Sequence, residues 1–182
     1  MNTFRPPQTL TTSRLQLRPL TEADAPLVFD GYASCADAVR FMPFSQHRYL
    51  DDSIAFARRC DRCWRDGTAF PWAIEQLDTG LFLGCIELRI LRPKADFGYI
   101  LGVKYWGNGY ATEAARAVVA AAMNLANVHR VWATCHPDNV ASIRVLEKAG
   151  LCFETRLRNW ETRPNLGEAA GDCLVYSMLR AK

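Results

Sequence analysis

The chain opens with a strand-like pattern that gives way to helical ones. Apolar and polar side chains alternate over residues 13–20, which predicts a half-buried strand. Thr21, with Asp24 three residues later, has the spacing of a capping box and predicts a helix start. We therefore expect helices over residues 24–39 and 50–66.

Strand patterns dominate the middle of the chain. Residues 69–76 and 81–91 are predicted to be two strands joined by a turn, and residues 96–103 a further strand. A loop with two glycines follows at 104–109. Apolar side chains then recur at helical spacing over 111–126, so a strand, a loop and a long helix follow one another directly.

The C-terminal part returns to strands. A short strand is expected at 131–135, and a helix that starts at Asn139 is expected to end at Gly150, a position that favours glycine. Strands are predicted over residues 151–160 and 172–179. This part of the chain therefore combines predicted strands with a predicted helix, and we expect an α/β fold.

Size and composition indicate one globular domain over residues 1–182. The hydrophobic fraction is 49% and the charged fraction 23%, both ordinary for a domain with one core. The sequence has no run of about 18 apolar residues, and Arg5, Pro6 and Pro7 stand where a secretory signal would be apolar. We expect a cytoplasmic protein without a membrane partner.

Charge and cysteine content argue against several other classes. The net charge of +3 is small and forms no block of like charges, so a nucleic-acid partner is not expected. The seven cysteines have no framework spacing. Cys60 and Cys63 form one C-x-x-C pair, but a structural zinc site needs about four ligands, so we expect no metal.

Gly107 and Gly109 carry the most informative chemistry. Two glycines between a strand and a helix allow successive backbone N–H groups to turn toward one anion, and the helix N-terminus adds partial positive charge. This favours a pyrophosphate ligand, although a tight turn without ligand has the same pattern. The dinucleotide and Walker motifs are both absent.

A longer pattern contains this loop. Residues 97–151 resemble motifs A and B of the GNAT acetyltransferases, and closely resemble the branch that includes ribosomal-protein N-terminal-alanine acetyltransferases. The Gln/Arg-x-x-Gly-x-Gly/Ala motif of the family falls on Lys104, Gly107 and Gly109, with lysine replacing the usual first residue. The aromatic-Trp-Gly-x-Gly-Tyr-Ala-Thr-Glu-Ala run of the branch falls on residues 105–114, and its Asn-x-x-Ser helix starts at Asn139.

The resemblance implies a fold and a cosubstrate. The GNAT fold is a mixed, mostly antiparallel sheet flanked by helices and splayed between the fourth and fifth strands, where acetyl-CoA enters. The implied cofactor-binding residues are Ile100, Leu101, Val103, Lys104, Gly107, Asn108, Gly109, Tyr110, Ala111, Asn139 and Ser142.

The resemblance also implies direct attack of a neutral amine on the thioester, without a covalent enzyme intermediate. The backbone N–H of Leu101 would polarise the thioester carbonyl. A carboxylate would accept the amine proton, and the candidates are Asp96 and Glu87, each of which could instead be a solvated carboxylate on a strand.

One position departs from the family pattern. Leu146 stands where many relatives have a tyrosine that protonates the departing thiolate. Ser142 is then the candidate acid, although its hydroxyl could instead bond a helix carbonyl or CoA. Asn139 is either a helix cap, a pantetheine ligand or both.

These observations predict an N-acetyltransferase that moves an acetyl group from acetyl-CoA to a primary amine, such as a protein N-terminus. The alternatives are a polyamine or aminoglycoside-like acceptor, or a module that binds acyl-CoA without turnover. We expect a monomer or a homodimer.

Overall fold

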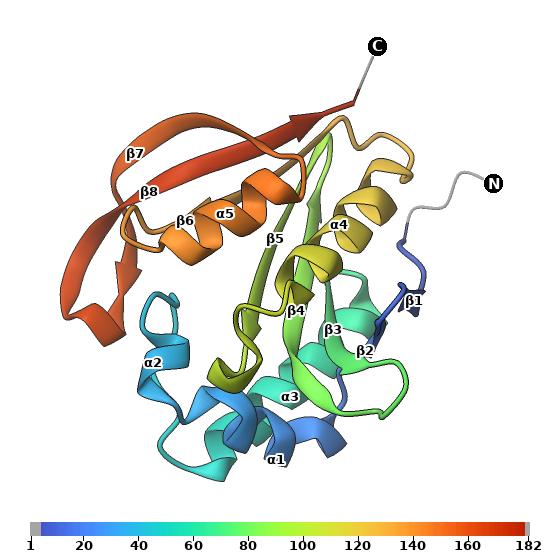
Figure 1. Cartoon of the computed structure of the whole chain (residues 1–182), viewed down its shortest axis with the longest axis vertical. Coiled ribbons are helices and arrows are strands. Elements are labelled where there is room, and N and C mark those ends of the chain that lie inside the picture. The colour runs from blue at the N-terminus through green and yellow to red at the C-terminus, as the bar shows by residue number, and fades with distance from the viewer. Residues whose placement is uncertain (1–4, 181–182) are drawn as a thin grey trace.

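The computed structural model describes residues 5–180, and the side chains of all of these except residues 168 and 169. Its centre is one sheet in the order β1-β2-β3-β4-β5-β6-β8-β7 (Figure 1). All neighbouring strands are antiparallel except β5 and β6, so the predicted mixed, mostly antiparallel sheet is confirmed. The strands are β1 (Leu10–Thr11), β2 (Leu15–Pro19), β3 (Ala69–Gln76), β4 (Phe82–Leu91), β5 (Lys94–Leu101), β6 (Arg130–Cys135), β7 (Cys152–Arg163) and β8 (Glu168–Leu179).

Helices cover both faces of the sheet. One face carries the helices of the first third of the chain, and the other face carries the helices that follow β5 and β6 (Figure 1). The α-helices are α1 (Ala25–Val28), α2 (Ala36–Val39), α3 (Leu50–Asp66), α4 (Tyr110–Met123) and α5 (Val140–Lys148).

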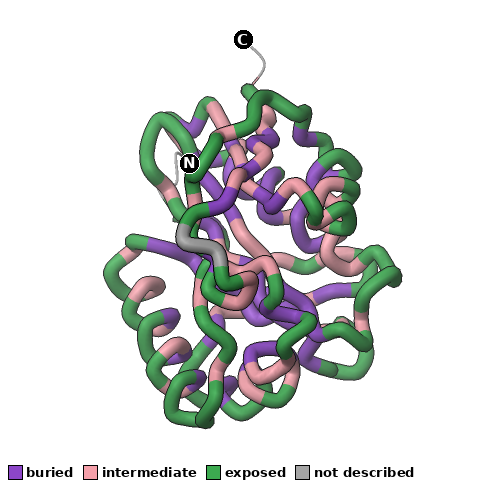
Figure 2. The backbone as a smooth tube through the Cα atoms, turned by 90° about the vertical axis from the view of Figure 1, so that its left-hand side faces the viewer, coloured by how far each residue is buried: buried purple, intermediate pink, exposed green. Residues whose placement is uncertain are grey.

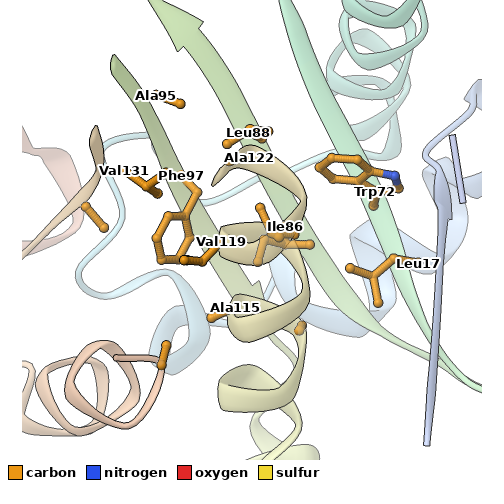
Figure 3. Close-up of a cluster of buried hydrophobic side chains, with 14 of the residues drawn as sticks. Leu17, Trp72, Ile86, Leu88, Ala95, Phe97, Ala115, Val119, Ala122 and Val131 are labelled. Atoms are coloured by element: carbon orange, nitrogen blue, oxygen red, sulfur yellow. The ribbon is translucent and has the colours of Figure 1, made fainter. Parts of the chain in front are cut away.

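The larger core lies between the sheet and α4. Figure 3 shows Val119 and Ala122 of α4 facing Phe97 and Ile86, with Trp72 at the far side of the cluster. The apolar stripe predicted for this helix is the face that is buried. Burial of large apolar side chains of this kind contributes about 1.5–3 kcal/mol each, so this core holds α4 firmly against the sheet.

A second, smaller core lies on the opposite face, under α1 and α3. Tyr32, Ala57 and Cys60 pack there against Cys85 and Ile100 of the sheet. Successive strand residues point to opposite faces, so the side chains of neighbouring residues pack in different cores. Figure 2 shows that the buried segments lie in the interior, while exposed residues follow the outer turns.

The single helix predicted over residues 24–39 is wrong, because this segment is broken. It forms a short 3-10 turn at Glu22–Asp24, then α1, a wide π-helical turn at Phe29–Ala33 and finally α2. The hydroxyl and the amide of Ser34 both donate to the Phe29 carbonyl, which ends the helix there.

The sheet splays between the fourth and fifth predicted strands, which are β5 and β6 because the short β1 precedes them. Only three residue pairs join β5 to β6, from Lys94 with Arg130 to Asp96 with Trp132. Beyond these pairs β5 continues to Leu101 with no partner strand on this side among residues 5–180, and α5 lies beside the divergence (Figure 1).

Across the described residues, none of the helices has both the length and the apolar content that a membrane span requires.

Candidate active site

The loop before α4 has the geometry of an anion cradle. Gly107 and Gly109 have φ values of 77° and 80°, a left-handed conformation that glycine adopts without strain. Helix α4 begins at Tyr110, and Glu113 is the first residue whose amide bonds back into the helix. Within the described part of the chain, the amides from Gly107 to Thr112 donate no hydrogen bond, so they are free to bind an anion.

Arg14 and Glu113 hold this loop in place. Arg14 donates to the Asn108 carbonyl at 3.1 Å, and its guanidinium also pairs with the Glu113 carboxylate at 2.7 Å. Thr12 and Ser13 donate to the same carboxylate. Burial raises the pKa of the Glu113 carboxyl, but hydrogen bonds from Thr12 and Arg14 outweigh burial and lower it below its usual value. The carboxylate therefore stays ionised and ties the loop to the N-terminal segment.

The unpaired edge of β5 presents backbone groups to the splay. The amide of Gly102 donates to Leu83 of β4, so by alternation the amide of Leu101 points the other way, into the gap. The indole N–H of Trp106 donates to the Leu101 carbonyl at 3.0 Å. The Leu101 amide therefore points into the gap, where the resemblance predicts a donor to the thioester carbonyl.

The start of α5 closes the other side of the gap. Asn139 caps this helix, because its side-chain oxygen accepts from the Ser142 amide at 3.1 Å. The Ser142 hydroxyl lies 2.8 Å from the phenol oxygen of Tyr99 on β5. Burial raises the pKa of Tyr99, and the contact with Ser142 lowers it by less, so the phenol remains protonated. Leu146 is fully buried in the larger core.

The glycine loop, the edge of β5 and the start of α5 line one cavity of about 880 Å³, a volume typical of ligand sites. Asp96, Lys104 and Asn108 are outside its lining. The other predicted site residues all contribute to it, namely Glu87, Ile100, Leu101, Val103, Gly107, Gly109, Tyr110, Ala111, Asn139 and Ser142.

Glu87 and Asp96 are both bound by arginine. The Glu87 carboxylate pairs with Arg59 of α3 at 2.8 Å and with Arg89 at 3.0 Å. Asp96 accepts two hydrogen bonds from Arg89, one of them at 2.8 Å. The alternation along β4 places Glu87 and Arg89 on the face that carries α3. Glu87 therefore faces the cavity, while Asp96 lies where β5 and β6 still pair.

Aromatic side chains line the part of the cavity below α2. They come from the second core and the segment after α2, and His47 lies between two of them, Phe44 and Phe56. Burial lowers the pKa of the His47 imidazole, whose Nδ1 is 2.7 Å from the Ser53 hydroxyl. This part of the cavity is therefore largely apolar and contains a neutral imidazole.

Glu161 and Arg163 of β7 form a charged pair that the sequence did not single out. Arg163 is almost fully buried and donates to Glu161 and to the Cys173 sulfur, both at 2.9 Å. Both residues line the cavity, as Glu87 does. In the sequence they look like the charges of a solvated strand, and we find no local signal that would have marked them.

The tip of the β7–β8 hairpin is fastened to the segment after α2. The Asn165 amide donates to the carbonyls of Val39 and Phe44 at 2.7 and 2.8 Å, and its oxygen accepts from the Gln46 amide at 2.9 Å. Figure 1 shows this tip beside α2, at the end of the hairpin. The hairpin thereby closes one side of the cavity.

The buried cysteines near the cavity are poor nucleophiles. Burial raises the pKa of the Cys135 thiol to about 12 and that of Cys85 well above its usual value. A thiol attacks as its thiolate, so both side chains are unreactive near neutral pH. The site is consistent with direct attack by an acceptor.

The sequence and the fold are similar to those of known acetyltransferases. Residues 14–151 match the family described as the acetyltransferase (GNAT) domain. The uncharacterized N-acetyltransferase YoaA of Bacillus subtilis is 29% identical over 176 residues, which cover 95% of this chain and 97% of YoaA.

Two solved structures share the fold. RimL, a ribosomal alpha-N-protein acetyltransferase in complex with coenzyme A, has a TM-score of 0.82 at 16% identity, with 94% of this chain and 97% of RimL covered. A spermidine N-acetyltransferase from Vibrio cholerae, in complex with CoA and spermine, has a TM-score of 0.76 at 16% identity, with 92% and 96% covered.

Proposed function

Because the chain belongs to the GNAT acetyltransferase family and is an acetyl-CoA-dependent N-acetyltransferase, we propose that its acceptor is the amino group at a protein N-terminus. The match to this family confirms the resemblance seen in the sequence. Solved structures with this fold include an alpha-N-protein acetyltransferase and a spermidine N-acetyltransferase, so the choice of amine depends on the cavity of this chain.

The two glutamates that line the cavity carry this proposal, because both are paired with arginine. Glu87 and Glu161 have side chains that are 12% and 30% exposed, and each is bound by arginine. A polyamine needs unpaired carboxylates for its several positive charges, and a cation entering here would compete with Arg59, Arg89 and Arg163. A peptide end brings one amine, and its first side chains can pack against the aromatic lining.

The loop and the unpaired strand edge fit acetyl-CoA. The free amides from Gly107 to Thr112 would bind the diphosphate, with Asn108 contributing its main chain. The edge of β5 from Tyr99 to Leu101 would pair with the pantetheine arm as an added strand, and Asn139 would bind the arm from α5. We propose the Leu101 amide as the donor to the thioester carbonyl.

We propose Glu87 as the group that accepts the amine proton, through water. It lines the cavity, whereas Asp96 lies outside the lining and acts by holding Arg89. Glu161 faces the same space from β7 and is the second candidate for this proton. Ser142 is proposed as the hydrogen-bond donor to the sulfur that departs.

The acceptor class is tested by following free thiol and product mass with acetyl-CoA. The panel holds short peptides with free N-termini, the same peptides with blocked N-termini, and spermidine. We expect thiol release with the free peptides only, and a mass increase of one acetyl group. Faster turnover of spermidine than of every free peptide would refute the protein N-terminus.

The catalytic assignments are tested with Glu87→Gln and Glu161→Gln. Proton removal by a positioned base contributes about 10²–10⁴-fold to a rate, so loss of the base should lower kcat by at least tenfold. Because the amine attacks in its neutral form, the reaction depends less on the base as pH rises. The loss of kcat in the variant should therefore be smaller in alkaline buffer. A lower kcat in Asp96→Asn alone would instead assign the role of proton acceptor to Asp96.

We further propose that residues 1–182 form a single domain, that the protein works in the cytoplasm, and that it is a monomer or a homodimer. Light scattering of the purified chain would report its mass directly.

A further inference from the structure

We propose that Tyr99 is a positioning residue that fixes the Ser142 hydroxyl as a hydrogen-bond donor to the sulfur that departs. This rests on the proposed function, since it deepens the role given to Ser142. Tyr99 lies on β5 and Ser142 in the first turn of α5, and their oxygens are 2.8 Å apart. Both side chains line the cavity.

The hydrogen bond joins the two halves of the splayed sheet. Strand β5 belongs to the half that includes β4, while α5 follows β6. Beyond Asp96 and Trp132 no ladder hydrogen bond joins β5 to β6 within the described structure. Tyr99 and Ser142 thus meet across the gap in which the pantetheine arm is expected.

The chemistry of the two hydroxyls sets the direction of this bond. A serine hydroxyl has one proton to donate and two lone pairs that accept. A phenol is the more acidic hydroxyl and the better donor, so Tyr99 donates and Ser142 accepts. The Ser142 proton is then left to point toward the cavity, where the sulfur would lie. Burial keeps Tyr99 protonated, so this direction persists across the working pH range.

Neighbouring contacts hold both side chains in place. The Tyr99 ring stacks on Phe97, with centroids 6.4 Å apart and planes 24° apart. The Ser142 amide is bound by the Asn139 cap, which fixes the first turn of α5. Leu146, where relatives carry a tyrosine, is buried in the larger core and has no hydroxyl to offer.

The step balances without ionising either side chain. The amide bond forms as the carbon–sulfur bond breaks, and the electron pair of that bond moves onto sulfur. The amine proton goes to the base. The Ser142 hydroxyl donates a hydrogen bond to the developing thiolate and keeps its proton, and the thiolate is protonated by solvent after release. Tyr99 supports this by occupying one lone pair of Ser142.

A double-mutant cycle tests the inference with Tyr99→Phe, Ser142→Ala and the combined variant. Tyr99→Phe keeps the ring and its stacking on Phe97, so we expect kcat about tenfold lower with an unchanged KM for acetyl-CoA. In the Ser142→Ala background the same substitution should cost nothing further, because Tyr99 acts through Ser142. Ser142→Thr keeps a hydroxyl and should restore the sensitivity to Tyr99→Phe.

Tyr176→Phe is the matched control. Tyr176 lies on β8, bonds Glu147 at 3.4 Å and is outside the cavity lining, so its loss should leave kcat unchanged. An equal loss from Tyr99→Phe with and without Ser142, or no loss in kcat, would overturn the inference. A wild-type protein that turns over no amine at all would instead refute the proposed function, so the two failures are distinguishable.

Discussion

Gly109 both turns the chain and presents amides to a ligand. Its φ of 80° costs a β-branched residue about 1–2 kcal/mol, and a valine side chain would also disturb the Arg14 contact, since a Cβ here lies 3.5 Å from that guanidinium. We predict that Gly109→Val raises the Kd for CoA at least tenfold. Titration calorimetry with CoA measures this directly.

Gly80 provides the control for backbone strain alone. It has a φ of 68° in the turn between β3 and β4, with no atom within 4 Å of an added Cβ. Gly80→Val should lower Tm to a similar extent without changing the Kd for CoA. Equal Kd values for Gly109→Val and the wild type would remove the loop from the binding site.

Single residues were predicted from the sequence where a local motif marks them. Gly107, Gly109 and Asn139 stand at turns or caps whose chemistry is local, and the structure places all three at the cavity. Tyr99 and Arg163 belong to strands with no such motif. Their positions depend on which segment packs opposite, which hydrophobic periodicity does not encode.

At the scale of elements, Gly84 sets how closely β4 approaches the end of β5. A Cβ added there would lie 2.1 Å from the Ile100 carbonyl and 2.8 Å from the Leu101 Cα. Both are main-chain atoms that cannot rotate away, so Gly84→Ala must push β5 outward. We predict a loss of several degrees in Tm together with a lower kcat, because the Leu101 amide moves.

Thermal melts and steady-state rates measure the two effects separately. Gly98→Ala is the comparison, because an added Cβ at Gly98 meets no atom within 4 Å. It should leave Tm within a degree or two of the wild type. A stable Gly84→Ala protein with normal kcat would show that the end of β5 tolerates displacement.

Asp24 links β2 to the turn that follows it and makes stability depend on pH. Burial raises the pKa of the Asp24 carboxyl, but hydrogen bonds from Arg18 and Thr21 outweigh burial and lower it. A lowered folded-state pKa stabilises the fold above the unfolded pKa, near 3.9, and this contribution is lost as pH falls through the folded value. We predict that Asp24→Asn costs about 2 kcal/mol at pH 7.

Urea denaturation at pH 7 and at successively lower pH tests this linkage. The stability gap between Asp24→Asn and the wild type should narrow below about pH 4, as the wild-type carboxyl becomes protonated. Glu22→Gln is the control in the same turn, because its ion pair with Arg58 is exposed and screened by solvent. A stability difference between Asp24→Asn and the wild type that stays constant with pH would show that the substitution acts through packing.

The elements themselves were largely predictable, and their interruptions were not. Strands β2 to β6 and helices α3 to α5 follow periodic runs closed by turn residues. The break at Phe29–Ala33 escaped prediction because it places Tyr32 in the second core and Gly31 against the sheet, and both contacts are tertiary. The splay followed from the resemblance, since no local pattern states which strands fail to pair.

At the scale of the whole molecule, the cavity is enclosed by segments that are far apart in the chain. Besides β5, the glycine loop and α5, its lining includes residues of β4, of the segment after α2 and of the β7–β8 hairpin. Asn165 joins the last two across 119 residues of sequence, from the hairpin tip to Gln46. We expect this contact to help the hairpin keep Glu161 and Arg163 at the cavity.

Asn165→Ala removes three hydrogen bonds to main-chain groups without touching the loop or β5. We predict that it raises the KM for the peptide acceptor about five- to tenfold, since each net hydrogen bond is worth about 1 kcal/mol and part of the loss is recovered by water. The KM for acetyl-CoA should not change. Thr155→Ala, an exposed position on the same hairpin, is the control.

The two KM values show whether the hairpin shapes the acceptor site or only stabilises the fold. If the hairpin only stabilised the molecule, Asn165→Ala would lower Tm, and the protein that remains folded would have unchanged KM values for both substrates. If the hairpin also shaped the acetyl-CoA site, both KM values would rise together. In the proposed cavity, Gly107, Gly109 and β5 build the acetyl-CoA end, and residues that Asn165 holds in place close the acceptor end. Only a rise confined to the KM for the acceptor matches this arrangement.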